Sequence, residues 1–148
     1  KTEWVDRGNL VYLFWPDMTE QTARRRLSRI LIELKKLPYA KDIEAEPTRL
    51  RWQVKTDVQD FVAANSEGRL NQAVQLYGGA LLETFRPPNV PEFESWLELE
   101  RQELHKIWKN AVLTLAGDFE SKEQYGQAAE VLERLHKVES FDETVFRR

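Results

Sequence analysis

Apolar residues recur at helical spacing through most of this chain, and the clearest case lies between Thr19 and Leu37. Within that stretch the apolar positions three and four residues apart are Ala23, Leu27, Ile30, Leu31 and Leu34. This spacing places them on one face of a helix with 3.6 residues per turn, so we expect that face to be buried. Asp17 followed three residues later by Glu20 is a start signal of the capping-box type, and Thr19 could begin the helix instead.

A shorter apolar segment, Leu10 to Trp15, comes just before this helix. We predict a helix over about Arg7 to Phe14, because Pro16 pushes the residue before it out of the helical region. A short loop, Pro16 to Thr19, then leads into the second helix. A helix, a tight loop and a helix indicate a helix-turn-helix, in which the first helix supports the second in the major groove of DNA.

Two short runs after these helices have the composition of strands. Ile43 to Glu46 and Arg49 to Val54 are separated by Pro47 and Thr48, which predicts a β-hairpin. In the second run the apolar residues Leu50, Trp52 and Val54 alternate with Arg49, Arg51 and Gln53. A strand here would turn its apolar side chains toward the helices and its arginines outward, and a helix-turn-helix followed by a basic hairpin is a winged helix. Two interpretations of the arginines stay open, namely contact with phosphate and protection of an edge strand by charge.

From Thr56 onward the periodicity is helical, with few strand-forming residues. We expect helices over Asp57–Asn65, Leu70–Leu82, Glu92–Phe119 and Tyr125–Val138, with Asp142 capping a further helix. Three prolines between Arg86 and Pro91 exclude helix and sheet there and predict a stiff loop.

The later helices have the spacing of tetratricopeptide repeats, in which small and aromatic residues let two antiparallel helices pack closely. The corresponding positions are Gly68, Ala73, Tyr77 and Ala80 in the first pair, and Ala116, Phe119, Tyr125, Ala128 and Leu132 in the second. Ser140 replaces the usual closing proline. The predicted fold is therefore mainly α, with a truncated winged helix-turn-helix and β-hairpin wing over residues 1–56 and an all-α, tetratricopeptide-like domain over residues 57–148.

Charge divides the chain at the same place. Residues 1–56 carry 12 Lys/Arg against 8 Asp/Glu, a net charge of +4, whereas residues 57–148 carry 10 against 17, a net charge of −7. Six of the basic residues lie between Thr19 and Leu37, against only Glu20 and Glu33. This asymmetry suggests two modules with different partners, a nucleic acid for the basic one. The alternative for the basic helix is a solvated surface without a ligand.

Several classes of protein are excluded or disfavoured by composition. The chain has no cysteine, so disulfides and thiolate metal sites are ruled out, which fits the cytoplasm. Its longest apolar run is far shorter than the roughly 20 residues that cross a bilayer. His105 and His136 are isolated, the glutamates between Glu92 and Glu103 fit a solvated helix face, and no glycine-rich phosphate loop occurs. We therefore expect that the protein is not an enzyme and that it has no cofactor, metal or membrane partner.

Short motifs follow one another in a recognisable order through nearly the entire chain. They are Leu10 with Phe14-Trp15-Pro16-Asp17, Ala23-Arg24 with Leu27, Leu34-Lys35-Lys36, Leu50, Asp57 with Phe61, Ala73, Leu76-Tyr77, Gly79, Leu81-Leu82, Phe85, Trp96-Leu97, Glu100-Arg101 and Leu104. In this order they resemble the bacterial transcriptional activators of the antibiotic-regulatory-protein type. That family joins a response-regulator-like winged helix to a tetratricopeptide-like bacterial transcriptional activator domain. Its winged helix begins with strands and a helix, so we expect Lys1 to follow a missing start, and an ATPase or further repeats could follow Arg148.

The resemblance implies a sequence-specific DNA-binding transcription regulator, an activator in the bacterial cytoplasm. Residues expected at phosphates are Arg24, Lys35, Lys36, Thr48, Arg49 and Arg51, and those expected at base edges are Arg25, Ser28, Arg29 and Ile32. Related winged helices touch RNA polymerase through the loop that corresponds here to Pro16, Asp17, Met18, Thr19 and Glu20. The expected partners are double-stranded promoter DNA, RNA polymerase holoenzyme and, through the acidic helical domain, a second copy in a homodimer. The alternative is a tetratricopeptide-like interaction scaffold that does not bind DNA directly.

Overall fold

The computed structural model describes residues 3–86 and 89–146. Within these residues the protein is 66% helical, with six helices and one three-stranded antiparallel sheet, so the prediction of a mainly α fold is confirmed. The chain divides into two compact units. The first unit comprises Lys1–Lys55 and Phe85–Glu98, and the second comprises Thr56–Thr84 and Leu99–Arg148. The predicted domains, residues 1–56 and 57–148, differ from these units in one respect. They place Phe85–Glu98 with the helices of the second unit.

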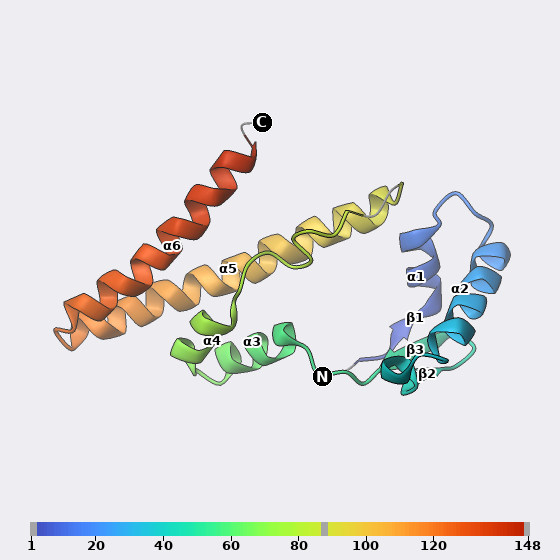
Figure 1. The fold of residues 1–148 in the computed structure, drawn as a ribbon, viewed down its shortest axis with the longest axis horizontal. Helices are drawn as coiled ribbons and strands as arrows, with labels where there is room; N and C mark the ends of the chain where they lie inside the picture. The colour runs from blue at the N-terminus through green and yellow to red at the C-terminus, as the bar shows by residue number, and fades with distance from the viewer. Residues whose placement is uncertain (1–2, 87–88, 147–148) are drawn as a thin grey trace. The chain divides into compact units, whose positions relative to one another are not determined.

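The first unit begins with a strand that the sequence did not reveal. Its elements are β1 (Val5–Asp6), α1 (Arg7–Phe14), α2 (Glu20–Leu34), the 3-10 turn η1 (Pro38–Ala40), β2 (Ile43–Ala45) and β3 (Arg49–Trp52) (Figure 1). The predicted helix over Arg7–Phe14 is confirmed, as is the hairpin, whose strands are shorter than expected. The strand order is β1-β3-β2, with Val5 opposite Leu50. Because β3 is the central strand, the interpretation of its two arginines as guards of an edge strand is wrong.

The core of the first unit forms where α1 and α2 pack on the hairpin. Its buried residues are Val11, Ala23, Leu27, Leu31, Ala40 and Ile43. Ala23, Leu27 and Leu31 confirm the predicted buried stripe of α2. Ile30 was expected in the stripe but is 38% exposed, because at 100° per residue it lies at the edge of the arc, well away from Leu31.

Of the two predicted starts of α2 the structure has the one at Thr19, and the end of the helix differs from the prediction. Asp17 does not begin the helix. Thr19 is the N-cap residue, and its hydroxyl donates to the Thr22 hydroxyl (2.9 Å) instead of capping a backbone N–H. The helix ends at Leu34, three residues earlier than expected, because the amides of Lys36 and Leu37 bond three residues back in a tighter turn. Lys35 and Lys36 therefore lie in the turn that follows α2.

An aromatic cluster holds the segment Phe85–Glu98 in the first unit. Phe93 is buried and stacks on Phe14 with 5.2 Å between ring centroids, and Phe85 and Trp96 pack against it. Pro91 does not belong to a loop as predicted. It is the first residue of α5 (Pro91–Ser121), a position that suits proline because no N–H is needed there. The predicted loop residues Pro87 and Pro88 lie outside the described residues.

The second unit consists of helices (Figure 1). They are α3 (Asp57–Ser66), α4 (Leu70–Leu76), the remainder of α5 and α6 (Tyr125–Phe146). A capping box between Thr56 and Gln59 starts α3 where expected. The helix predicted to reach Leu82 ends at Leu76, since Gly79 (φ 148°) and Leu82 (φ 49°) leave the helical region. The predicted cap at Asp142 is wrong, because that residue lies inside α6.

Trp108 on α5 is the centre of the second unit's core. Its ring is fully buried, stacks on Tyr77 with 4.8 Å between centroids, and donates Nε1–H to the Val74 carbonyl at 3.4 Å. Arg101 holds the irregular segment after α4, because it donates to the carbonyls of Leu81 (2.8 Å) and Leu82 (2.7 Å). In the described parts of the chain, no helix is both long and apolar enough to pass through a membrane.

Replacing Trp108 by alanine should destabilise the second unit by about 3–5 kcal/mol, because it opens a large cavity under α4 and removes the Tyr77 stack. Urea denaturation monitored by circular dichroism measures this loss of stability. Leu113→Ala is the matched control, since Leu113 lies on the same helix with 47% of its surface exposed. An equal loss in both variants would contradict the packing described here.

Candidate nucleic-acid interface

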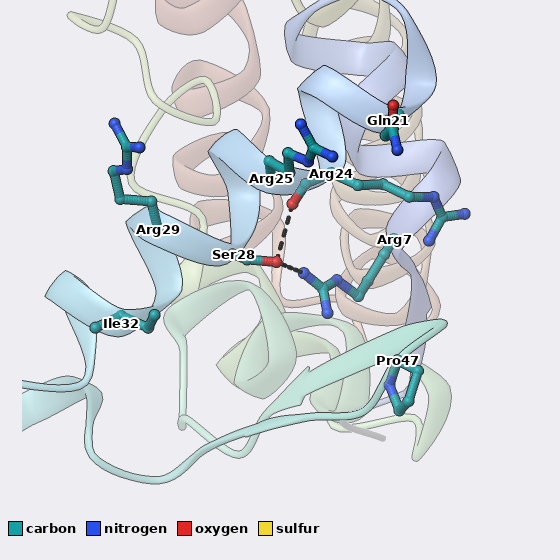
Figure 2. A pocket seen from close by; sticks show the side chains of 8 residues that line it. All are labelled: Arg7, Gln21, Arg24, Arg25, Ser28, Arg29, Ile32 and Pro47. Atoms are coloured by element: carbon teal, nitrogen blue, oxygen red, sulfur yellow. Dashed lines mark hydrogen bonds between the residues drawn. The ribbon is translucent and has the colours of Figure 1, made fainter.

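The outward face of α2 carries two exposed arginines. Arg25 and Arg29 are exposed, and neither makes a hydrogen bond or ion pair with any residue that the structure describes. Ile32 lies beside them and is 62% exposed. These three residues were predicted to face DNA bases, and the structure brings them together on one side of the helix (Figure 2).

A hollow of about 470 Å³ opens beside this face. It is lined by Arg7, Gln21, Arg24, Arg25, Ser28, Arg29, Ile32 and Pro47 (Figure 2). We call it the arginine hollow. Four guanidinium groups from two helices border it, and guanidinium groups bind phosphate and the acceptor edges of guanine through paired N–H donors. The hollow therefore suits an anionic, acceptor-rich ligand.

Arg7 fixes the position of α2 relative to the hairpin. Its Nη1 donates to the Glu46 carbonyl (3.1 Å), its Nη2 donates to Ser28 Oγ (2.6 Å), and its backbone N–H donates to the Thr48 carbonyl (2.8 Å). One residue thus joins the start of α1, the middle of α2 and the β2–β3 turn. Sequence reasoning missed Arg7 because its partners lie 21 and 39 positions away.

Ser28 and Arg24 have protein partners, in contrast to Arg25 and Arg29. Ser28 Oγ accepts from Arg7 and donates to the Arg24 carbonyl (2.9 Å), so both of its hydrogen-bonding roles serve the fold. Arg24 pairs with Glu20 at 2.7 Å on the helix surface. Such exposed pairs exchange readily with other charged partners. Ser28 was expected at base edges, and the structure gives it a positioning role instead.

The basic residues after α2 are exposed. Lys36 pairs with Glu33 at 2.8 Å, one helical turn back. Lys35 makes no side-chain hydrogen bond or ion pair within the described part of the chain. Both lysines could meet phosphate, and Lys35 could do so without leaving a protein partner.

The arginines of β3 are held by acidic neighbours. Arg51 donates to both carboxylate oxygens of Glu44 (2.8 Å each), and Arg49 donates to Glu46 at 2.7 Å. The guanidinium groups also lie over the Trp4 ring, at 4.7 Å for Arg51 and 4.4 Å for Arg49. The hydrogen bonds from Arg51 lower the pKa of Glu44, and the bond to Glu46 raises the pKa of Arg49. A phosphate contact by either arginine would form beside a negatively charged glutamate, which weakens it.

The remaining predicted residues lie in the turns at the two ends of the first unit. Thr48 is exposed in the β2–β3 turn, where its carbonyl accepts from Arg7. Of the loop predicted to contact polymerase, Pro16, Met18 and Glu20 border a second hollow of about 310 Å³, Asp17 and Thr19 are exposed, and Glu20 is the first residue of α2. Next to this loop, Arg26 lies over the Trp15 ring at 5.2 Å.

No metal site is found among the described residues, where no three His, Cys, Asp or Glu side chains gather. His105 instead packs against Trp108 and Tyr77, with centroid distances of 5.7 and 6.3 Å. Comparisons with models of known protein families, with curated proteins and with solved structures find no match to this chain. The geometry of α2 and the arginine hollow is therefore the basis for a functional proposal.

Arg7→Lys should lower the free energy of unfolding of the first unit by about 1–3 kcal/mol, because lysine cannot hold Ser28 Oγ and the Glu46 carbonyl in the fixed geometry of a guanidinium. Hydrogen exchange of the backbone amides in α2 and β3 reports the loss. Arg25→Lys is the control and should change these amides little, since Arg25 is exposed. Equal protection in Arg7→Lys and the unmodified protein would show that Arg7 does not hold the hairpin.

Proposed function

We propose that this chain is a DNA-binding transcription regulator that contacts double-stranded DNA through α2. The observation that carries the proposal is the exposed face of Arg25, Arg29 and Ile32 beside the arginine hollow. A solvated helix usually pairs its charges with opposite ones, whereas these two arginines have no partner in the described chain. Their chemistry suits guanine edges and phosphates, and Ile32 suits a thymine methyl group.

The finer fold belongs to the same proposal. The order of α1, loop, α2 and hairpin supports a winged helix with α2 as its recognition helix. For the second unit we propose a tetratricopeptide-like activator domain, supported by buried Ala73, Ala116 and Ala128 where that repeat has small residues. Tyr125 departs from the repeat pattern, because it is 66% exposed instead of packed.

In this proposal the residues of the first unit have distinct roles. Arg25 and Arg29 read base edges, and Arg24 and Lys35 fix the register through phosphates. Arg7 and Ser28 hold α2 at a constant position relative to the hairpin, so that both can meet the same duplex. The hairpin contributes less than α2, since the charges of its arginines are already offset by Glu44 and Glu46.

The partners of the regulator are promoter DNA and RNA polymerase holoenzyme in the bacterial cytoplasm. The hollow beside Pro16 and Met18 supports a protein contact at the loop before α2, because its walls are mainly apolar. The acidic second unit suits contact with a protein, including a second copy in a homodimer, better than contact with DNA. Activation of transcription is the output proposed for this arrangement.

Binding of the full chain to a random-sequence duplex should weaken steeply with salt. With about four to six phosphate contacts, the slope of log K against log salt should be about −4 to −5. Fluorescence anisotropy between 50 and 200 mM salt should therefore show a loss of about 10²- to 10³-fold. A flat response, or no binding at low salt, would contradict DNA binding and favour the interaction-scaffold alternative.

Substitutions should distinguish the base contacts of α2 from the phosphate contact in the turn that follows it. Arg25→Ala or Arg29→Ala should cost about 1–3 kcal/mol on a selected duplex and little on a random one, because base contacts are lost. Lys35→Ala should weaken both duplexes equally and reduce the salt slope by about one. Competition between the two duplexes at one salt concentration measures the difference, with the exposed Lys106→Ala of the second unit as control. Equal losses on both duplexes for Arg25→Ala would remove its role in reading sequence.

A further inference from the structure

Gln21 lies in the first turn of α2 and had no role in the sequence analysis. Its side chain is exposed and borders the arginine hollow next to Arg25 (Figure 2). Its amide makes no hydrogen bond with any residue in 3–86 or 89–146. An exposed glutamine is ordinary on a helix surface, so its position relative to its neighbours decides whether it can act.

Gln21 continues the line of side chains formed by Arg25, Arg29 and Ile32 along α2 (Figure 2). At 100° and 1.5 Å per residue, the four positions lie within about 80° of arc and extend over about 16 Å. Gln21 is the N-terminal member of the line, and the N-terminal residues of a recognition helix are those that reach base edges.

Within the described residues, three polar side chains near Gln21 have protein partners, in contrast to Arg25. Arg24 pairs with Glu20, and the Thr22 hydroxyl is bonded to Thr19. Ser28 is engaged by Arg7. Gln21 is therefore the uncharged polar side chain of this face whose donor and acceptor groups remain available in the described chain.

A glutamine amide offers one acceptor oxygen and a donor NH₂ group side by side. In the major groove adenine presents N7 as acceptor and N6–H as donor, the pair that glutamine can bind at once. Resting on the proposed function, we infer that Gln21 is a specificity-determining residue that selects an adenine. On a recognition helix, residues three to four positions apart contact neighbouring bases, so this adenine lies about one base pair from the guanine that Arg25 selects.

The test is selection of binding sequences by the full chain from a pool of random 20-base-pair duplexes. The unmodified protein, Gln21→Ala, Gln21→Arg and Gln127→Ala are selected in parallel at one salt concentration. Gln127 is a matched control because it is an exposed glutamine in the first turn of α6. Circular dichroism confirms that each variant is folded, which is expected since alanine and arginine both favour helix.

The unmodified chain and Gln127→Ala should select the same motif, with an adenine about one base pair from a guanine. Gln21→Ala should lose the preference for that adenine alone, by about tenfold, and Gln21→Arg should replace it with guanine. An identical motif from all four proteins, or an equal loss at every position, would overturn the role of Gln21 while leaving DNA binding intact. If the unmodified protein binds no duplex at all, the proposed function fails and this inference with it.

Discussion

The burial of one apolar stripe on α2 determines which charges the first unit presents to its surroundings. Ala23, Leu27 and Leu31 lie in the core, and each buried leucine contributes on the order of 2 kcal/mol. Rotating the helix to hide its arginines would expose this stripe and bury unpaired charge, which is far more costly. The sequence period therefore fixes the outward direction of Arg25 and Arg29. Their exposure is a consequence of packing, and the proposed DNA contact is built on that consequence.

The hydrogen bonds of Arg7 add a second constraint, because they set where the hairpin turn lies relative to α2. A hydroxyl of α2 and two backbone carbonyls of the β2–β3 turn meet at this residue. In the same arrangement Ser28 Oγ accepts from Arg7 and donates to the Arg24 carbonyl, so the hydroxyl is engaged within the fold. The ion pairs of Arg49 and Arg51 with glutamates give the hairpin a small net charge, so the positive potential of the unit is concentrated on α2 and its following turn.

Much of the fold could be predicted from local signals in the sequence. The parts that depend on contacts between distant residues could not. The end of α1 follows from Pro16, and the approximate bounds of α3 and α5 follow from apolar periodicity. The early end of α4 was missed because apolar residues continue past Gly79, where the backbone turns away. The strand β1 was missed because it has only two residues, both exposed, and its pairing partner lies over 40 residues away. Among site residues, Gln21 could have been found from its place on the helix face, but Arg7 could not, since only folding brings it to Ser28.

The most direct test of the account is a crosslink between α2 and duplex DNA. A photoreactive benzoylphenylalanine in place of Ile32, which is 62% exposed, should attach to a bound duplex on illumination. The same group in place of Tyr125, which is 66% exposed in the second unit, should attach to DNA far less. The predicted result is a crosslink at position 32 that forms at low salt and does not form when high salt prevents DNA binding. Crosslinking at position 125 with none at position 32 would show that α2 is not the surface that binds DNA.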